Sequence, residues 1–334
     1  NKLKLPKKLN NNINGFHNWM LEHLHELFVD YFNEYNSRPY QGYAIMPLLN
    51  LYSFSTNKKV KEASKMILDL LSTIFAIQSN KGRRSVPFRR QIVYEPLDSI
   101  IPGDGEIARH ALLSGELSFY NGNRDSKVIN YGTQFMLVSA ISDYIIPDFI
   151  LDLIIKTNHN SFFQILNHQT PEIYFNSPSF LVSGGGIHVN RLDGATKLND
   201  GWARPTTLIP TNDNNHKLSS WFRFPGNKKR LRRKNTCVYK NFACGLNFKE
   251  PSNISEACKI KQGNWTFYNF DRPDCNLNYG LHLAVFSKKC DSWKCKRRAS
   301  NFALWEVREK SEISFSNFMK KIMVNNSDFY SKKI

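Results

Sequence analysis

Residues 34–43 read Glu-Tyr-Asn-Ser-Arg-Pro-Tyr-Gln-Gly-Tyr, and they open the stretch, residues 34–90, on which our prediction of the fold depends. Two apolar helical runs follow this polar loop, and a basic loop running from Gly82 to Arg90 closes the stretch. Because Pro39 cannot continue a helix and Gly42 permits a turn, we expect the opening residues to form a loop. The stretch therefore predicts two loops rich in Asn, Tyr and Arg, held by helices.

The first half of the chain carries the hydrophobic spacing of helices. Apolar residues recur at steps of three and four over residues 16–32 and 58–79, and residues 44–54 are almost wholly apolar, which indicates a buried helix. Ser55-Thr56-Asn57 offers N-cap side chains to the helix that begins at residue 58. Residues 81–103 contain three prolines and read as a long loop. Helical patterns return at residues 105–119, 128–142 and 147–156.

The texture changes at about residue 171, where short alternating or aromatic runs are separated by Gly, Pro, Asn and Asp. Such runs are typical of antiparallel strands. We expect strands at residues 172–175, 180–183, 206–209, 221–224, 237–243, 265–270, 281–287 and 303–307. Residues 313–324 return to a helical pattern. Two domains follow from this order: a helical part, residues 1–168, and an antiparallel β part with a C-terminal helix, residues 169–334.

The composition indicates a packed protein with affinity for polyanions. The 334 residues are 41% hydrophobic and 13% aromatic, and the formal net charge is +18. This charge predicts attraction to nucleic acid, an anionic membrane or an acidic polysaccharide; the plainer alternative is a bias toward lysine that serves only solubility. The sequence contains no run of about 20 apolar residues, so we expect no membrane-spanning segment. The first residue is not Met, so we expect a mature product or a fragment.

All six cysteines lie between Cys237 and Cys295. An even number crowded into one region favours disulfides and an oxidising compartment, so we expect an extracellular, cell-surface or periplasmic protein. Free buried thiols and a metal site are the alternatives. Only Cys290 and Cys295 approach the close spacing that zinc requires, and no spacing in the chain demands a metal or cofactor, so we expect none.

The stretch at residues 34–90 resembles a helical hairpin of bacterial (α/α)-toroid proteins allied with the heparinase II/III and chondroitin/alginate lyase architecture. The motifs that carry the resemblance are Glu34 to Ser37 with Tyr40, the apolar run Leu48-Leu49-Asn50-Leu51, Ala63 with Asp69-Leu70-Leu71, and the step from Ser79 to Gly82-Arg83. The resemblance implies an α+β fold: an incomplete (α/α) toroid of helical hairpins followed by an antiparallel β-sandwich region. The glycines after Ser183 and the segment from Ala203 fit the same order.

The function implied by this resemblance is a polysaccharide lyase that acts on an acidic, uronate-containing or sulfated polysaccharide by proton abstraction and β-elimination. Such a lyase needs a group that neutralises the sugar carboxylate and groups that move protons. The expected catalytic residues are Tyr40, Tyr43 and His188. The expected substrate-binding residues are Asn36, Arg83, Arg84, Arg191, Trp202 and Arg204. Each has a plainer interpretation, since Asn36 can cap a helix, Tyr40 can pack, His188 can be structural and loop arginines are often only solvated.

Other chemistries find less support. The glycines after Ser183 are not followed by the Lys-Ser/Thr of a phosphate-binding loop, and neither a nucleophile elbow nor a His-Glu-x-x-His zinc motif occurs. A basic run, residues 228–234, and a second basic cluster, residues 294–298, come without a nucleic-acid-binding motif, so nucleic acid is a disfavoured partner. A non-catalytic polyanion-binding or structural module, and a glycoside hydrolase on the same toroid, stay as alternatives.

Overall fold

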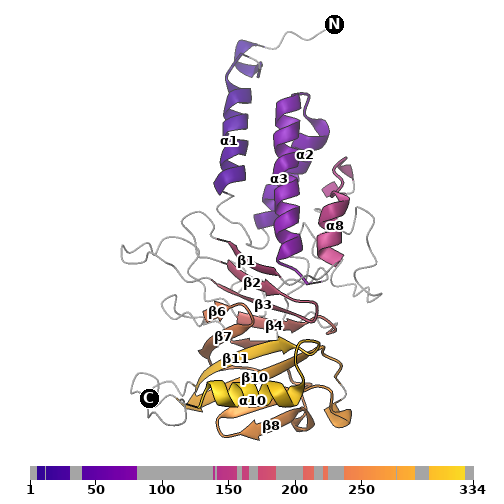
Figure 1. Ribbon diagram of the computed structural model, residues 1–334. Helices are drawn as coiled ribbons and strands as arrows, with labels where there is room; N and C mark the ends of the chain where they lie inside the picture. Colours follow the sequence, from indigo (N-terminus) through magenta and orange to yellow (C-terminus); the bar gives the residue numbers. More distant parts are fainter. Residues whose placement is uncertain are drawn as a thin grey trace. The chain divides into compact units, whose positions relative to one another are not determined.

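The computed structural model describes residues 6–11, 13–30, 40–80, 138–139, 141–155, 160–164, 172–185, 206–213, 221–224, 237–275, 277–289 and 301–327. We refer to these as the described residues. The chain divides into two compact units (Figure 1). The first unit comprises Asn1–Ala76 with Gly103–Leu153, and the second comprises Ile77–Pro102 with Ile154–Ile334.

The first unit is helical in its described part. After a short 3-10 turn, η1 (Lys7–Leu9), come α1 (Phe16–Asp30), α2 (Tyr40–Phe54), α3 (Lys58–Ile77) and α8 (Asp148–Ile155). The last residues of α3 and α8 fall just within the range of the second unit. The helices expected from the spacing at residues 16–32, 58–79 and 147–156 are therefore confirmed.

Helix α3 begins directly after its capping residue, Asn57. The Asn57 side-chain oxygen accepts hydrogen bonds from the backbone N–H groups of Lys59 (3.0 Å) and Val60 (3.3 Å). These donors have no partner within the helix, so the side chain stabilises its first turn. Along one face of the helix the apolar side chains are buried, among them Ile67, Leu71 and Phe75. Capping and periodicity thus agree on this helix.

Helix α2 corrects the prediction of a loop up to residue 43. The helix begins at Tyr40, immediately after Pro39, and Gly42 lies within it rather than in a turn. Proline is compatible with the start of a helix, because the first N–H groups lack helical acceptors in any case. Pro47 lies inside the helix and is exposed. The apolar face is buried through Ile45, Leu48 and Leu49.

The prediction of an incomplete (α/α) toroid followed by a β-sandwich region is wrong. The described residues contain α1, α2, α3 and α8, with one further α-helix in the second unit, and no ring of helical hairpins forms among them. Helical spacing tells which face of a helix is buried, but it leaves open how many helices pack together and in what order. The observed fold is instead a mixture of helices and two antiparallel sheets.

Five strands of the second unit form an antiparallel sheet in chain order, which we call the first sheet. They are β1 (Asn160–Gln164), β2 (Glu172–Asn176), β3 (Phe180–Gly185), β4 (Thr206–Pro210) and β5 (Phe222–Phe224). In the register, Phe175 lies opposite Val182, and Leu181 lies opposite Ile209. Strand β4 is buried along its whole length, which places it inside the unit rather than at its surface.

The second sheet contains six antiparallel strands in the order β6-β7-β11-β10-β9-β8. They are β6 (Cys237–Tyr239), β7 (Phe242–Leu246), β8 (Lys259–Gln262), β9 (Trp265–Asn269), β10 (Leu281–Lys289) and β11 (Asn301–Glu309). Between β7 and β8 lies the 3-10 turn η7 (Glu256–Cys258), and between β9 and β10 lies η8 (Pro273–Cys275). The two long strands β10 and β11 pair over nine residues each and form the middle of the sheet.

Both faces of the second sheet are covered. One face shares a core with the first sheet, in which the Phe224 and Trp305 rings stack with centroids 4.5 Å apart. The other face packs against the C-terminal helix α10 (Phe315–Asn325), which lies across the sheet in Figure 1 and buries Phe318 and Ile322 against Phe267. Burying an aromatic side chain of this size contributes about 2 kcal/mol or more, so these contacts hold the layers together.

No helix among the described residues combines the length and apolar character needed to cross a membrane.

Candidate functional site

The structure describes the side chain of one of the nine residues expected to form the site. Tyr43 lies on α2 with 48% of its surface exposed. Tyr40 is the first residue of that helix, and its side chain is outside the described part. The remaining residues of the expected site also lie outside the described residues: Asn36, Arg83, Arg84, His188, Arg191, Trp202 and Arg204. Their assembly into a cleft stays a prediction.

The first unit contains a buried network around Tyr144. Its hydroxyl donates a hydrogen bond to Asp69 Oδ1 (2.9 Å) and lies 3.4 Å from Ser72 Oγ. The other carboxylate oxygen, Asp69 Oδ2, lies 2.6 Å from Lys65 Nζ. Burial raises the pKa of Tyr144 well above its ordinary value, and the neighbouring Asp69 carboxylate raises it further. Tyr144 therefore stays protonated at neutral pH, and its contacts with Asp69 and Ser72 link its segment to α3.

The second unit contains a cluster of charges at the edge of its second sheet, where Lys259 begins β8. The Lys259 side chain is only 6% exposed, and its Nζ lies 2.6 Å from Glu250 Oε1 and 2.8 Å from Glu256 Oε1. The Tyr268 hydroxyl donates to the second oxygen of Glu250 (2.7 Å). Burial and the Glu250 carboxylate raise the pKa of Tyr268, while hydrogen bonds from Lys259 and Lys261 lower the pKa of Glu256. We call this arrangement the Lys259 cluster.

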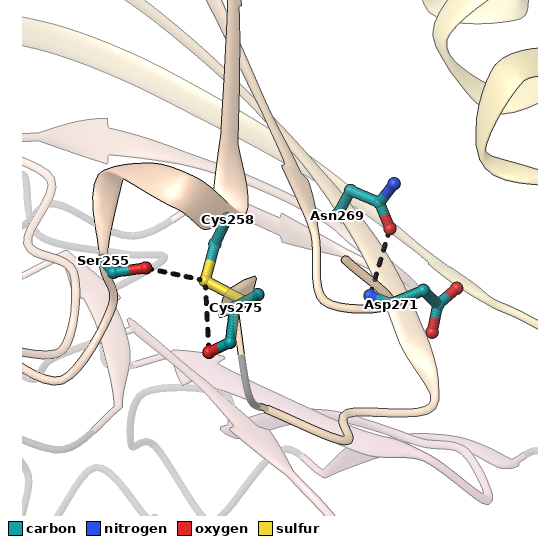
Figure 2. Close-up of a disulfide and its surroundings, with 5 residues drawn as sticks. All are labelled: Ser255, Cys258, Asn269, Asp271 and Cys275. Carbon is teal, nitrogen blue, oxygen red and sulfur yellow. Dashed lines mark hydrogen bonds between the residues drawn. A yellow bond between two sulfur atoms is a disulfide. The ribbon is translucent and has the colours of Figure 1, made fainter. Parts of the chain in front are cut away.

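A disulfide, drawn in Figure 2, involves Cys258, the residue that directly precedes Lys259. It joins Cys258, the last residue of η7, to Cys275, the last residue of η8, with Cα atoms 4.8 Å apart. Both cysteines are buried, and the Ser255 hydroxyl lies 3.6 Å from Cys258 Sγ. On the connection between the two turns, Asn269 Oδ1 accepts a hydrogen bond from the backbone N–H of Asp271 (3.1 Å). One pair of the expected disulfide framework is thus present.

The one buried histidine of the described residues is His282, on β10. Its Nε2 lies 3.2 Å from the carbonyl oxygen of Ile313, so Nε2 carries the proton and donates it. Its Nδ1 is buried without a hydrogen-bond partner, and the ring packs on Phe315 and Phe318. Burial lowers the pKa of His282. A neutral histidine held against an apolar helix is a packing residue.

The polar interactions in these clusters connect neighbouring segments within each unit. Tyr144 and Tyr268 have raised pKa values, and the buried ammonium of Lys259 is held between carboxylates. Among the described residues, no group of three or more His, Cys, Asp or Glu side chains is placed to hold a metal ion.

The sequence offered a signal for the Lys259 cluster that our prediction of strands passed over. Gly263-Asn264 is a dipeptide typical of two-residue hairpins, and Gly263 adopts a positive φ of 58°. The hairpin pairs β8 with β9 and sets Lys259 opposite Tyr268. The position of Glu250 beside both residues depends on the path of the loop before η7, which no local pattern predicts.

Charge is distributed unevenly along the chain. The described ranges hold 18 Lys and Arg against 17 Asp and Glu, whereas the whole chain holds 46 against 28. Nearly all of the net charge of +18 therefore belongs to the ranges between the described ones, which include residues 81–90, 228–234 and 294–298. In the described part, several cations lie within ion-pair distance of carboxylates, such as Arg308 with Glu306 (2.9 Å) and Lys310 with Asp271 (2.5 Å).

Comparison with known proteins adds no relative to this picture: no family model, no curated protein and no solved structure matches the chain.

Proposed function

We propose that this chain is a polyanion-binding module whose partner is an acidic polysaccharide. The observation that carries the proposal is the separation of charge: the packed framework is balanced in acidic and basic residues, and the excess of positive charge lies in other stretches. A folded framework gains nothing from such an excess, because like charges repel. A ligand that presents many negative charges offsets this repulsion.

The choice of a polysaccharide over nucleic acid rests on two features. The basic stretches come without a nucleic-acid-binding motif. The disulfide between Cys258 and Cys275 is of the kind that forms and persists in oxidising compartments, outside the cytosol. On this proposal the protein works at the cell surface, in the periplasm or outside the cell, where acidic polysaccharides are the common polyanions.

Retention on immobilised polyanions tests the binding proposal. The full chain is applied at low ionic strength to columns carrying heparin or polygalacturonate, with an uncharged dextran column as control, and is eluted with a salt gradient. We expect retention on the anionic columns that salt reverses, because exposed charges are screened within about 8 Å at physiological ionic strength. Passage through both anionic columns at low salt, with a folded protein, refutes the proposal.

Two variants that lose the same number of positive charges distinguish binding at a localised basic site from binding through the net charge of the whole chain. The test variant replaces the six basic residues of the run at 228–234 by Gln: Lys228, Lys229, Arg230, Arg232, Arg233 and Lys234. The control variant replaces six exposed lysines of the charge-balanced part: Lys58, Lys59, Lys240, Lys249, Lys320 and Lys321. We expect the test variant to elute at clearly lower salt than the control. Equal shifts show that the run holds no special role.

Lyase chemistry is the second candidate, favoured by one observation: Tyr43, one of the expected proton-transfer residues, is half exposed on α2. Incubation with a panel of acidic polysaccharides, followed at the absorbance of 4,5-unsaturated uronate, detects this activity. A rise that is lost in each of the variants Tyr40→Phe, Tyr43→Phe and His188→Ala supports those assignments. If absorbance stays flat while salt-reversible retention persists, the protein is a binding module alone.

A further inference from the structure

The hairpin at the edge of the second sheet holds two cysteines directly opposite each other. Cys237 in β6 and Cys244 in β7 are register partners, joined through the turn at Lys240 and Asn241. Partners in an antiparallel pair have Cα atoms about 4.5 to 5.5 Å apart and side chains on the same face. This spacing falls within the range of about 4.4 to 6.8 Å that disulfides span. No backbone rearrangement is needed to bring the sulfurs together.

Both cysteines are thiols in this structure, whereas Cys258 and Cys275 of the same unit are joined. The two thiols differ in their surroundings. Cys237 is exposed on the outermost strand of the sheet, and Cys244 is half-buried, where it packs beside the cluster that α10 covers. The contact between the side chains is direct, because the Cys237 thiol is a hydrogen-bond neighbour of Cys244.

We propose that Cys237 and Cys244 are a reversible thiol–disulfide site that exchanges with low-molecular-weight disulfides such as oxidised glutathione. In the first step the Cys237 thiolate attacks one sulfur of the small disulfide, forms a mixed disulfide and releases one small thiolate. In the second step the Cys244 thiolate attacks the sulfur of Cys237 and releases the second small thiol. The protein loses two hydrogens and two electrons, and the small disulfide is reduced to two thiols.

The order of the two steps follows from accessibility. A small disulfide reaches the exposed sulfur of Cys237 first. Burial, with the hydrogen bond to Cys237, raises the pKa of Cys244 to about 12, so its thiolate is scarce at neutral pH. Cys244 is instead suited to resolve the mixed disulfide, because its neighbour holds the electrophilic sulfur in contact with it.

This pair differs from Cys258–Cys275 in its protection from solvent. The Cys258 side chain is fully buried and Cys275 nearly so, while Cys237 lies at an exposed sheet edge. Exposed disulfides are the more easily reduced ones. We therefore expect the Cys237–Cys244 bond to open in a glutathione buffer about tenfold less reducing than the buffer that opens Cys258–Cys275.

Peptide mapping after redox equilibration tests the proposal. The full chain is incubated in glutathione buffers that range from reducing to oxidising and is then unfolded in guanidinium chloride containing N-ethylmaleimide, so that buried free thiols are also blocked. After removal of the denaturant, the protein is digested with trypsin without reduction. Cleavage after Lys234, Lys240 and Lys249 separates the two cysteines onto the peptides 235–240 and 241–249. Cys290 and Cys295 fall on other peptides, since each follows a lysine. We expect the first two peptides joined as one species that dithiothreitol splits.

Two variants provide the controls. Cys237→Ser, at an exposed position, removes the joined species and leaves Cys244 free to react with maleimide, whereas Cys258→Ser leaves the joined species in place. The proposal is overturned if both thiols still react with maleimide in buffers where Cys258–Cys275 is formed. It is equally overturned if glutathione remains on Cys237 as a mixed disulfide, or if either cysteine is found joined to the peptides of Cys290 or Cys295.

Discussion

Removing the disulfide between Cys258 and Cys275 destabilises the second unit by an amount that the loop length sets. The two cysteines are 17 residues apart. In the chain-entropy model, a cross-link that closes a loop of this size lowers the entropy of the unfolded chain, and its removal costs about 3 kcal/mol of stability at 25 °C. Both sulfurs are buried, so substitution by alanine also removes packing contacts. We expect the double variant Cys258→Ala, Cys275→Ala to lose about 3 kcal/mol or somewhat more.

Urea unfolding followed by tryptophan fluorescence measures this loss. Trp221, Trp265 and Trp305 are fully buried in the second unit, so their emission reports its unfolding. With a denaturant slope of about 2 kcal/mol per molar urea, a loss of 3 kcal/mol lowers the midpoint by about 1.5 M. The wild-type chain kept reduced in dithiothreitol loses the cross-link but keeps the packing of its sulfur atoms, so its midpoint is expected to lie at or slightly above that of the double variant.

Cys237→Ser is the matched control, because its thiol is exposed at the sheet edge and lies outside the loop. Measured in dithiothreitol, this variant is expected to unfold within about 0.5 kcal/mol of the reduced wild-type chain. The reasoning fails if the double variant keeps the midpoint of the oxidised wild type. It also fails if the reduced wild type remains as stable as the oxidised one, since the bond then adds nothing to the folded state.

Three further predictions concern single residues. A Cβ atom added at Gly280 would lie 2.5 Å from Ser179 Oγ, which the Glu309 carboxylate holds in place. Gly280→Ala is therefore expected to lower the free energy of unfolding in urea by about 1–3 kcal/mol, and adding Ser179→Ala is expected to restore part of this loss. Asn57→Ala removes the cap of α3 and is expected to cost about 1 kcal/mol, whereas Thr56→Ala, next to it and exposed, leaves the thermal midpoint unchanged. The pKa of His282 is lowered below its ordinary 6.5, so as the pH falls the histidine of the unfolded chain binds a proton before that of the folded chain. We expect the contribution of His282 to the free energy of unfolding to be complete above pH 6.5 and to be lost as the pH falls below it. A His282→Gln variant whose urea midpoint falls just as steeply with pH would contradict this origin.

Local patterns predicted most of the elements. Each of the eight runs expected as strands overlaps an observed strand, although residues 237–243 cover β6 and the start of β7 with a turn between them, and β1 and β8 were not predicted. The helices at residues 58–79 and 313–324 are present as α3 and α10. These predictions succeed because each depends on residues close in sequence: alternation in strands such as β10, spacing of three and four in α3, and the side chain of Asn57 at a helix start. Pro39 and Gly42 are compatible both with a turn and with the start of a helix, and in the structure a helix begins at Tyr40.

The sequence by itself also determined the net charge of the chain and the concentration of its cysteines in one region, because both can be read from the order of residues without knowing which residues are in contact. Only the tertiary structure decided how the elements combine. It replaced a ring of helical hairpins by helices and two antiparallel sheets, and it joined Cys258 to Cys275 among many possible pairings. It also brought Glu250, Lys259 and Tyr268 together. Such choices depend on which buried faces fit one another across long separations in the chain, and hydrophobic spacing records only that a face is buried, not what covers it.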